Sequence, residues 1–293
     1  MIVVREATTP EERFAAQVAA QAALIDRLPD EAVRAMLTAL EQARQMVLAE
    51  LAVLDPASYA SFRLAQTQAG ITDVMARFVE QYQSAVSPAQ LAMWDAGAGL
   101  AAEPLVRAGL MFHVPIPSRR LLEAARAYQA SLITGLAGDA ITQISTALRA
   151  GVLRGQSVYE VMQAVAGSLA GPSVFASIAQ RAETITRTEL GRVQSIANQA
   201  ALEDAKGFVP DLQKQWQHSG NMGRWRREGH VEAEGQIREP DARYRVRPQP
   251  GQPYEDLLYP RDPAGSARST IGCGCLSAPY RAAWADVLRL EAA

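Results

Sequence analysis

The apolar residues in the first two thirds of the chain recur with the period of an α-helix, and this pattern constrains the fold most strongly. One segment shows it clearly, with apolar residues at intervals of three and four: Val33, Met36, Leu40, Ala43, Val47, Leu51 and Leu54. Such spacing places them in one stripe along a helix. Hydrophobic residues make up 48% of the chain but aromatic residues only 6%, which favours helices packed through small side chains. We therefore predict a long helical body.

Capping and breaking residues predict where these helices begin and end. Thr9-Pro10-Glu11-Glu12 combines a cap residue, a first-turn proline and acidic residues, so a helix is expected to start there. Ser157, followed three residues later by Glu160, is a capping box that starts another helix. A further helix is expected from Arg119 to about Ala150. Breaks are expected, in chain order, at Pro29-Asp30, Asp55-Pro56, Ser87-Pro88, Gly97-Ala98-Gly99 and the stretch from His113 to Pro117.

The character of the sequence changes after Gly207. Residues 208–272 are rich in Arg, Gly, Pro and Gln and lose the helical period. Short strand-like pieces, such as residues 243–247, alternate with turns such as Pro250-Gly251, and a short helix is expected from Pro279 to Leu290. The predicted fold class is mainly α: a long helical body followed by a small α+β C-terminal module with short strands. Its expected divisions are residues 1–135, 136–206 and 207–293.

Charge and composition exclude several classes of protein. The formal net charge is −2, which argues against a protein that coats nucleic acid or an anionic membrane by bulk electrostatics. No apolar run is long enough for a membrane span, and the first residues lack the pattern of a signal peptide. The two cysteines cannot build a secreted disulfide framework. We expect a soluble protein made in a reducing cytoplasm, with no membrane partner.

Potential metal ligands are concentrated in the C-terminal module. His218, His230, Cys273 and Cys275 all lie there and are the residue types that bind tetrahedral zinc. The Cys-x-Cys spacing differs from the common Cys-x2-Cys knuckle and makes a poor disulfide, so a structural role without metal stays open. A third reading is a catalytic thiol with His230 as its base. His113, in the proline-rich loop, is interpreted as a partly buried loop histidine.

A basic cluster precedes His230. Arg224, Arg226 and Arg227 flank Trp225, and such a combination can grip phosphate and stack on bases. The same arginines can instead pair with the acidic residues that follow: Glu228, Glu232 and Glu234. The chain contains no phosphate-binding P-loop, no His-Glu-x-x-His and no Gly-x-Ser-x-Gly, so no enzyme is expected. On the helix of residues 181–201, the charged residues are expected to form ion pairs and Asn198 to anchor the following loop.

Several phrases then occur in a characteristic order. They are "RAETITRTEL" with Asn198 downstream, "KQW" at 214–216, Arg227 with His230, Gly235-Gln236 and "YPRDPAGSARSTIGCGC" at 259–275. Together they resemble the phage head morphogenesis family, the minor head proteins similar to the F protein of phage Mu. The family has Arg where this chain has Gly274, and Asn where it has Gly272. The residues that carry the resemblance are Arg187, Thr188, Glu189, Asn198, Trp216, Arg227, Gly235, Pro260, Asp262, Pro263 and the two cysteines.

The resemblance implies a structural virion protein made in the host cytoplasm. Members of this family are low-copy head components that bind the portal and assist head assembly, DNA packaging or DNA delivery. The implied partners are the portal protein, the major capsid or scaffolding protein, and packaged double-stranded DNA. Residues 1–135 would then be the variable portal-docking region, and 136–293 the family domain. The alternative is a nucleic-acid-binding or metal-dependent enzymatic module that acts on DNA through the Arg/His cluster, and a structural zinc ion is a candidate cofactor.

Overall fold

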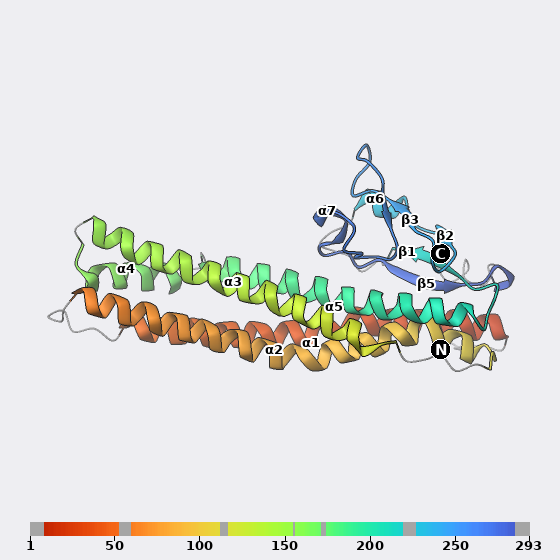
Figure 1. Cartoon of the computed structure of the whole chain (residues 1–293), viewed down its shortest axis with the longest axis horizontal. Coiled ribbons are helices and arrows are strands. Elements are labelled where there is room, and N and C mark those ends of the chain that lie inside the picture. Colours follow the sequence, from red (N-terminus) through yellow and green to blue (C-terminus); the bar gives the residue numbers. More distant parts are fainter. Residues whose placement is uncertain are drawn as a thin grey trace, which may run out of the picture. The chain divides into compact units, whose positions relative to one another are not determined.

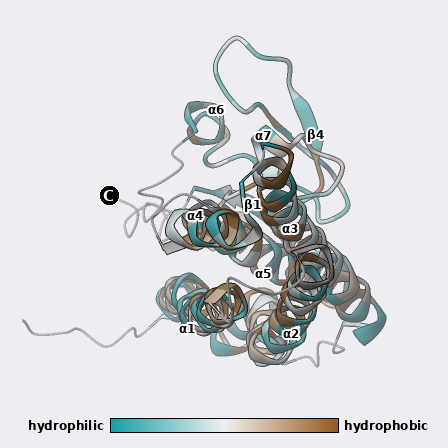
Figure 2. Ribbon diagram, turned by 90° about the vertical axis from the view of Figure 1, so that its left-hand side faces the viewer, coloured by the Kyte–Doolittle hydropathy of each residue, from teal (hydrophilic) through white to brown (hydrophobic). Residues whose placement is uncertain are grey.

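The computed structural model describes residues 9–52, 60–111, 117–154, 156–170, 174–218 and 227–284. Long helices form most of the chain and a small region of short strands follows them (Figure 1), so the predicted fold class is confirmed. The helices before the module are α1 (Pro10–Ala52), α2 (Ala60–Arg107), α3 (Arg119–Leu153), α4 (Val158–Ala170) and α5 (Val174–Lys206). Figure 2 shows hydrophilic and hydrophobic bands side by side on these helices, as the apolar periodicity requires.

The C-terminal module contains two small antiparallel sheets. The first has the order β2-β1-β5 and the second is the hairpin of β3 and β4. The bounds are β1 (Gln213–Gln217), α6 (Glu228–Val231), β2 (Ile237–Arg238), β3 (Tyr244–Val246), β4 (Glu255–Leu257), α7 (Ala267–Thr270), β5 (Leu276–Tyr280) and a 3₁₀ turn (Ala282–Trp284). The strand predicted at residues 243–247 is therefore confirmed.

The predicted helix from Pro279 is wrong at its start. Pro279 and Tyr280 belong to β5, whose five residues are all buried and pair with β1 along their whole length. Burial on both faces removes the alternation of polar and apolar residues that marks a strand, so β5 gives no period-two signal. Residues 285–290 of that prediction lie outside the described residues.

Both predicted capping residues act as expected. The Thr9 hydroxyl accepts a hydrogen bond from the Glu12 backbone N–H at 3.2 Å, and the Glu12 carboxylate accepts one from the Thr9 N–H at 3.0 Å. Ser157 and Glu160 exchange the same pair of bonds, at 3.2 and 2.8 Å. Each pair satisfies two backbone donors that the first turn of a helix leaves without partners.

Three predicted helix breaks are wrong, because Pro29 lies inside α1 while Ser87-Pro88 and Gly97-Ala98-Gly99 lie inside α2. A proline inside a helix costs about 3 kcal/mol, but long flanking stripes of buried residues hold both helices together. At Gly97, a Cβ atom would collide with the Gln194 carbonyl of α5. That glycine allows two helix backbones to approach closely and does not end the helix.

The chain divides into two compact units, each assembled from distant segments. Unit 1 contains Met1–Pro29, Ala89–Ala125 and Arg187–Ala293, and unit 2 contains Asp30–Pro88 and Arg126–Thr186. Two of the boundaries follow Pro29 and Pro88 directly, where the sequence predicted breaks. These prolines therefore mark the division between units although the helices continue through them. The sequence-based divisions near residues 135 and 206 stay predictions.

Each unit has its own buried side chains. In unit 1 the Phe14 and Trp284 rings pack with centroids 4.9 Å apart, so the end of the described chain packs against α1. In unit 2 the residues of the predicted apolar stripe from Val33 to Leu51 are buried, and Leu54 lies outside the described residues. Among the described residues, no helix is long and apolar enough to cross a membrane.

A buried hydrogen-bond network lies in unit 2. The Tyr82 hydroxyl accepts a bond from Gln129 Nε2 at 2.6 Å and lies 3.0 Å from Thr186 Oγ1. It joins α2, α3 and α5 through polar atoms, and all three side chains are almost fully buried. Such a network selects one helix register because a shift would leave its polar atoms without partners.

We predict that Tyr82→Phe lowers the free energy of unfolding by roughly 1–2 kcal/mol, because Gln129 loses its buried acceptor. Urea denaturation checks this, with Tyr159→Phe as the matched control at an exposed position of α4. Equal stability of the two variants would contradict the structural role of the network.

Candidate metal centre

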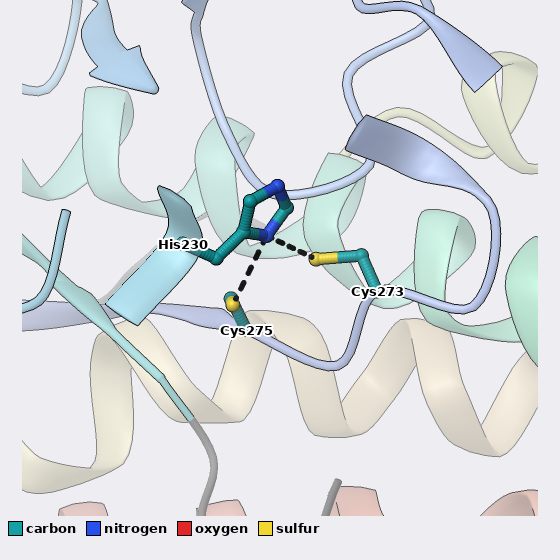
Figure 3. Close-up of side chains that lie close together, drawn as sticks. All are labelled: His230, Cys273 and Cys275. Carbon is teal, nitrogen blue, oxygen red and sulfur yellow. Dashed lines mark hydrogen bonds between the residues drawn. The ribbon is translucent and has the colours of Figure 1, made fainter. Parts of the chain in front are cut away.

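Three potential metal ligands converge in the C-terminal module. The imidazole of His230, on α6, directs Nδ1 toward both sulfur atoms of the segment that joins α7 to β5 (Figure 3). Nδ1 lies 3.5 Å from Cys273 Sγ and 3.6 Å from Cys275 Sγ, and all three donor atoms lie within 4.8 Å of one another. The exposed fractions of these residues are 1%, 5% and 1%. The sequence-based grouping of His230 with both cysteines is thus a spatial cluster.

His230 is held on a short helix by close packing. Its ring packs in a T-shaped arrangement with Trp216 of β1, with centroids 5.6 Å apart and planes at 82°. Its neighbour Gly229 has no side chain, and a Cβ there would collide with the Arg247 carbonyl. Arg227 donates a hydrogen bond to the Ile271 carbonyl, which links the start of α6 to the cysteine segment. Together these contacts leave the imidazole little freedom.

The cysteine segment is attached to α5 by polar contacts. The Gly272 N–H donates to Thr188 Oγ1 at 2.9 Å, and Asn198 Nδ2 donates to the Ser277 carbonyl at 2.7 Å. Gly272 itself has φ of +65°, a conformation that glycine adopts without strain. Asn198 therefore anchors β5, and not the loop after α5 as predicted, because β5 returns to α5 after the chain has formed the rest of the module.

Arg261 completes this attachment and was missed by the sequence analysis. Its guanidinium donates to the Cys273 carbonyl, to Gln194 Oε1 at 3.0 Å and to Ser195 Oγ at 3.1 Å. The residue is 3% exposed and has φ of +66°. Arg261 lies between the turn residues Pro260 and Asp262, and an arginine in such a loop is normally predicted to be exposed. Only an unusual setting, an arginine inside a proline-aspartate turn, could have drawn attention to it.

Buried charges surround the two sulfur atoms. Glu189 forms two hydrogen bonds with Arg192, at 2.9 and 2.7 Å, and Arg192 also donates to the Arg261 carbonyl at 3.1 Å. Burial raises the pKa of Glu189, and the charge of Arg192 opposes this shift. The guanidinium of Arg261 is buried beside this ion pair, and burial disfavours its charged form. Burying an uncompensated charge is costly, so an anion beside Arg261 is favoured.

The cysteines are the groups beside Arg261 that can supply that anion. A hydrogen bond from the Cys275 thiol lowers the pKa of Cys273 well below its ordinary value, with further help from His230 and Arg261 against the effect of burial. The same hydrogen bond and burial raise the pKa of Cys275. The pair therefore holds one thiolate readily, and a thiolate is the form that binds metals.

The three donor atoms could occupy three of the four positions of a tetrahedral metal. Zinc bonds of about 2.3 Å to sulfur and 2.0–2.1 Å to nitrogen, at a tetrahedral angle, separate the two ligand atoms by about 3.6 Å. The separations of 3.5 and 3.6 Å agree with this, and in the metal-free chain they are hydrogen-bond distances between sulfur and imidazole nitrogen. His230 Nε2 is buried and has no hydrogen-bond partner among the described residues. The position of the ring is therefore not explained by a hydrogen bond at Nε2. The cluster of three could hold a metal ion, and the fourth predicted ligand, His218, is not part of it.

The other residues that carry the family resemblance build the frame of this module. Gly235, at φ of +77°, donates its N–H to the Trp216 carbonyl at 2.9 Å. Asp262 accepts hydrogen bonds from the Leu258 and Ala264 N–H groups, at 2.7 and 2.9 Å, and so shapes the turn that carries Arg261. Pro260 is buried in this turn, whereas Pro263 is exposed and Arg187 is half-buried.

The basic cluster is only partly described. Arg224, Arg226 and Trp225 lie outside the described residues, as does His113. Arg227 makes the backbone contact given above, and Glu232 pairs with Arg247, at 2.6 Å. Glu234 accepts a bond from the His218 N–H. Glu232 and Glu234 thus each have a described partner, and their predicted pairing with the arginines of the cluster stays a prediction.

Comparison with known proteins adds little to the geometry. Over 101 residues, the chain is 31% identical to a protein of Bacillus subtilis (strain 168) named as the uncharacterized protein YqbB. The match spans 34% of this chain and 30% of that protein, so the chain covers less than a third of its relative. No protein-family model matches the chain. No solved structure matches it either.

A buried lysine gives the module a pH-dependent stability. Lys214 Nζ donates to Gln199 Oε1 at 3.1 Å and to the Leu258 carbonyl at 2.7 Å, and the side chain is fully buried. Burial lowers the pKa of Lys214 to about 8. Between that value and the ordinary lysine pKa, the folded chain binds fewer protons than the unfolded chain, so stability rises with pH.

We predict that the wild-type protein gains stability relative to Lys214→Met between pH 7.5 and 9.5, by roughly 2 kcal/mol at the upper end. Urea denaturation of both proteins at several pH values measures this. The difference between their free energies of unfolding cancels the contributions of the other titrating groups, which both proteins share. Parallel stability curves would show that the folded protein does not depress the pKa of Lys214.

Proposed function

We propose that this chain is a structural minor head protein of a tailed phage or phage-derived element. It binds the portal and assists head assembly, DNA packaging or DNA delivery, and it resides in the virion, inside the capsid or at the portal vertex. The major capsid or scaffolding protein and packaged double-stranded DNA are its further candidate partners. The proposal starts from the order of motifs from "RAETITRTEL" to the terminal Cys-x-Cys.

One observation carries the proposal: three motif residues, Thr188, Asn198 and Arg227, each bond to the segment on either side of the Cys-x-Cys pair, far away in the chain. Thr188 bonds to Gly272 and Asn198 to Ser277, across 84 and 79 positions. Arg227 bonds to Ile271 across 44 positions. Residues that recur in a fixed order are best explained by a shared structural role. In this module they hold distant segments of the chain together by hydrogen bonds.

The burial of the cluster supports a structural role over catalysis. A catalytic thiol or base must touch its substrate, whereas His230, Cys273 and Cys275 are each at most 5% exposed. The enzymatic alternative also requires His230 to face DNA, which its burial does not favour. A net charge of −2 agrees with protein contacts as the main basis of partner binding.

The proposed cofactor is a structural zinc ion held by His230, Cys273 and Cys275. Zinc would cross-link α6 to the segment before β5 through its coordination bonds, which is how zinc acts in structural sites. Thiolate and imidazole donors suit zinc better than magnesium or calcium, which prefer oxygen. The portal proposal and the zinc proposal stand independently of each other.

We expect the protein to co-purify with the portal protein of its own genome. Co-expression of the two, followed by affinity capture of the portal and size-exclusion chromatography, should place this chain in the fraction of portal rings. A related measurement is its presence in assembled particles by mass spectrometry. Absence from both portal rings and particles would refute the proposed function.

We expect purified, reduced protein to contain nearly one zinc per chain. Cys273→Ser and Cys275→Ser should each reduce this content strongly, while Ser266→Ala, on the exposed start of α7, should not. Chelation should lower the melting temperature of the wild type more than that of the cysteine variants. Less than a tenth of an equivalent in a folded sample would exclude the zinc ion and leave the portal proposal untouched.

The alternative function has its own test. Turnover of a nucleic-acid substrate that is abolished by His230→Ala, in a protein that remains folded, would overturn the purely structural reading. Steeply salt-dependent DNA binding by the full chain would favour direct DNA contact.

A further inference from the structure

Arg261 lies outside both the cysteine segment and α5, yet its side chain contacts both. Its guanidinium donates to the carbonyl of Cys273, and the same group donates to Gln194 and Ser195 of α5. It therefore connects a candidate ligand to a helix that supplies no ligand.

The surrounding chain is built to receive this side chain. Gly191 lies against it, and a Cβ atom there would lie 2.7 Å from Arg261 Nε and 2.8 Å from Cζ. The Arg261 carbonyl accepts a bond from Arg192, and the turn that presents Arg261 is closed by Asp262. A left-handed backbone conformation at an arginine is uncommon and requires such support.

We infer that Arg261 is a positioning residue of the proposed zinc centre, and that through it helix α5 sets the affinity of His230, Cys273 and Cys275 for metal. The inference rests on the zinc centre proposed above. Arg261 touches no metal; it fixes the backbone from which Cys273 directs its sulfur toward His230 Nδ1. Residues that orient metal ligands typically contribute 10- to 100-fold to metal affinity.

The arrangement has a reciprocal consequence. If contacts on α5 raise the affinity for metal, then bound metal must strengthen the same contacts by the same factor. Residues 188–198 of α5 include Thr188, Gln194, Ser195 and Asn198, all of which bond to the returning chain or to Arg261. Metal binding would thus hold the cysteine segment and β5 on this helix.

Cobalt(II) is the probe for the experiment, because its thiolate complexes absorb in the near ultraviolet and report both affinity and ligand geometry. The full-length, reduced protein is titrated with Co(II) in competition with a chelator of known affinity, and Zn(II) then displaces the cobalt. Four variants are compared with the wild type: Arg261→Met, Arg261→Lys, Ser195→Ala and Gly191→Ala. Arg268→Met, at an exposed arginine of α7, is the matched control.

We expect Arg261→Met to bind Co(II) 10- to 100-fold more weakly than the wild type, with a shifted visible spectrum. Arg261→Lys should not rescue binding, because an ammonium group cannot donate to three separated acceptors in the geometry of a guanidinium fork. Ser195→Ala removes one hydrogen bond to Arg261 and should weaken binding roughly three- to tenfold. Arg268→Met should bind as the wild type does.

Gly191→Ala distinguishes positioning from general stability. Alanine is the better helix former, so helix content should not fall, yet the added methyl group displaces the Arg261 side chain. Weaker Co(II) binding in a variant with undiminished helix content is expected only if Arg261 positions the ligands. Circular dichroism of the metal-free proteins provides this control, and Ser195→Ala and Gly191→Ala keep the test decisive if Arg261→Met fails to fold.

The possible failures are separable. If the wild type gives no thiolate–cobalt band, the zinc centre is refuted and the inference falls with it. If the wild type binds Co(II) and Arg261→Lys, Ser195→Ala and Gly191→Ala bind it equally well, the zinc centre stands and the role of Arg261 is refuted. Full rescue by Arg261→Lys would show that charge alone, and not position, is required.

Discussion

The C-terminal module depends on a buried guanidinium group. Arg261 carries its charge into a buried region where the nearby carboxylate of Glu189 already pairs with Arg192 and that of Asp262 accepts backbone hydrogen bonds. Burial disfavours the charged form of Arg261, and the cysteines oppose this effect. The guanidinium, the thiols and the polar side chains of α5 must therefore form together, because each would be a costly buried polar group without the others.

This interdependence gives each residue of the module a specific task. Thr188 and Asn198 offer hydrogen bonds to backbone groups of the returning chain, and Gly191 leaves space for a side chain. Trp216 packs against His230, and Asp262 closes the turn before the cysteines. A cluster assembled in this way suits a rigid attachment of the cysteine segment and β5 to α5, and its three donors could hold a metal ion. It is less suited to chemistry on a large substrate, which needs access.

Much of the helical body could be predicted, because burial of one stripe and capping of the first turn are local properties. Thr9 and Ser157 act as the sequence indicates, and the stripe from Val33 to Leu51 is buried. The helix breaks at Pro29 and Pro88 could not be judged locally. Whether a proline ends a helix depends on how much packing holds the two halves in line, and that packing comes from other segments.

The order of residue types was sufficient to group His230 with Cys273 and Cys275 and to predict a mainly helical chain with a small mixed module. It could not exclude His218 from the cluster, assign Asn198 to β5 or identify Arg261. These depend on contacts between segments separated by tens of residues, where burial converts an ordinary arginine into a structural cation and a Cys-x-Cys pair into a candidate ligand set. Helical periodicity is a property of residues close together in the sequence. The charge balance of a buried site arises only when distant segments fold around it.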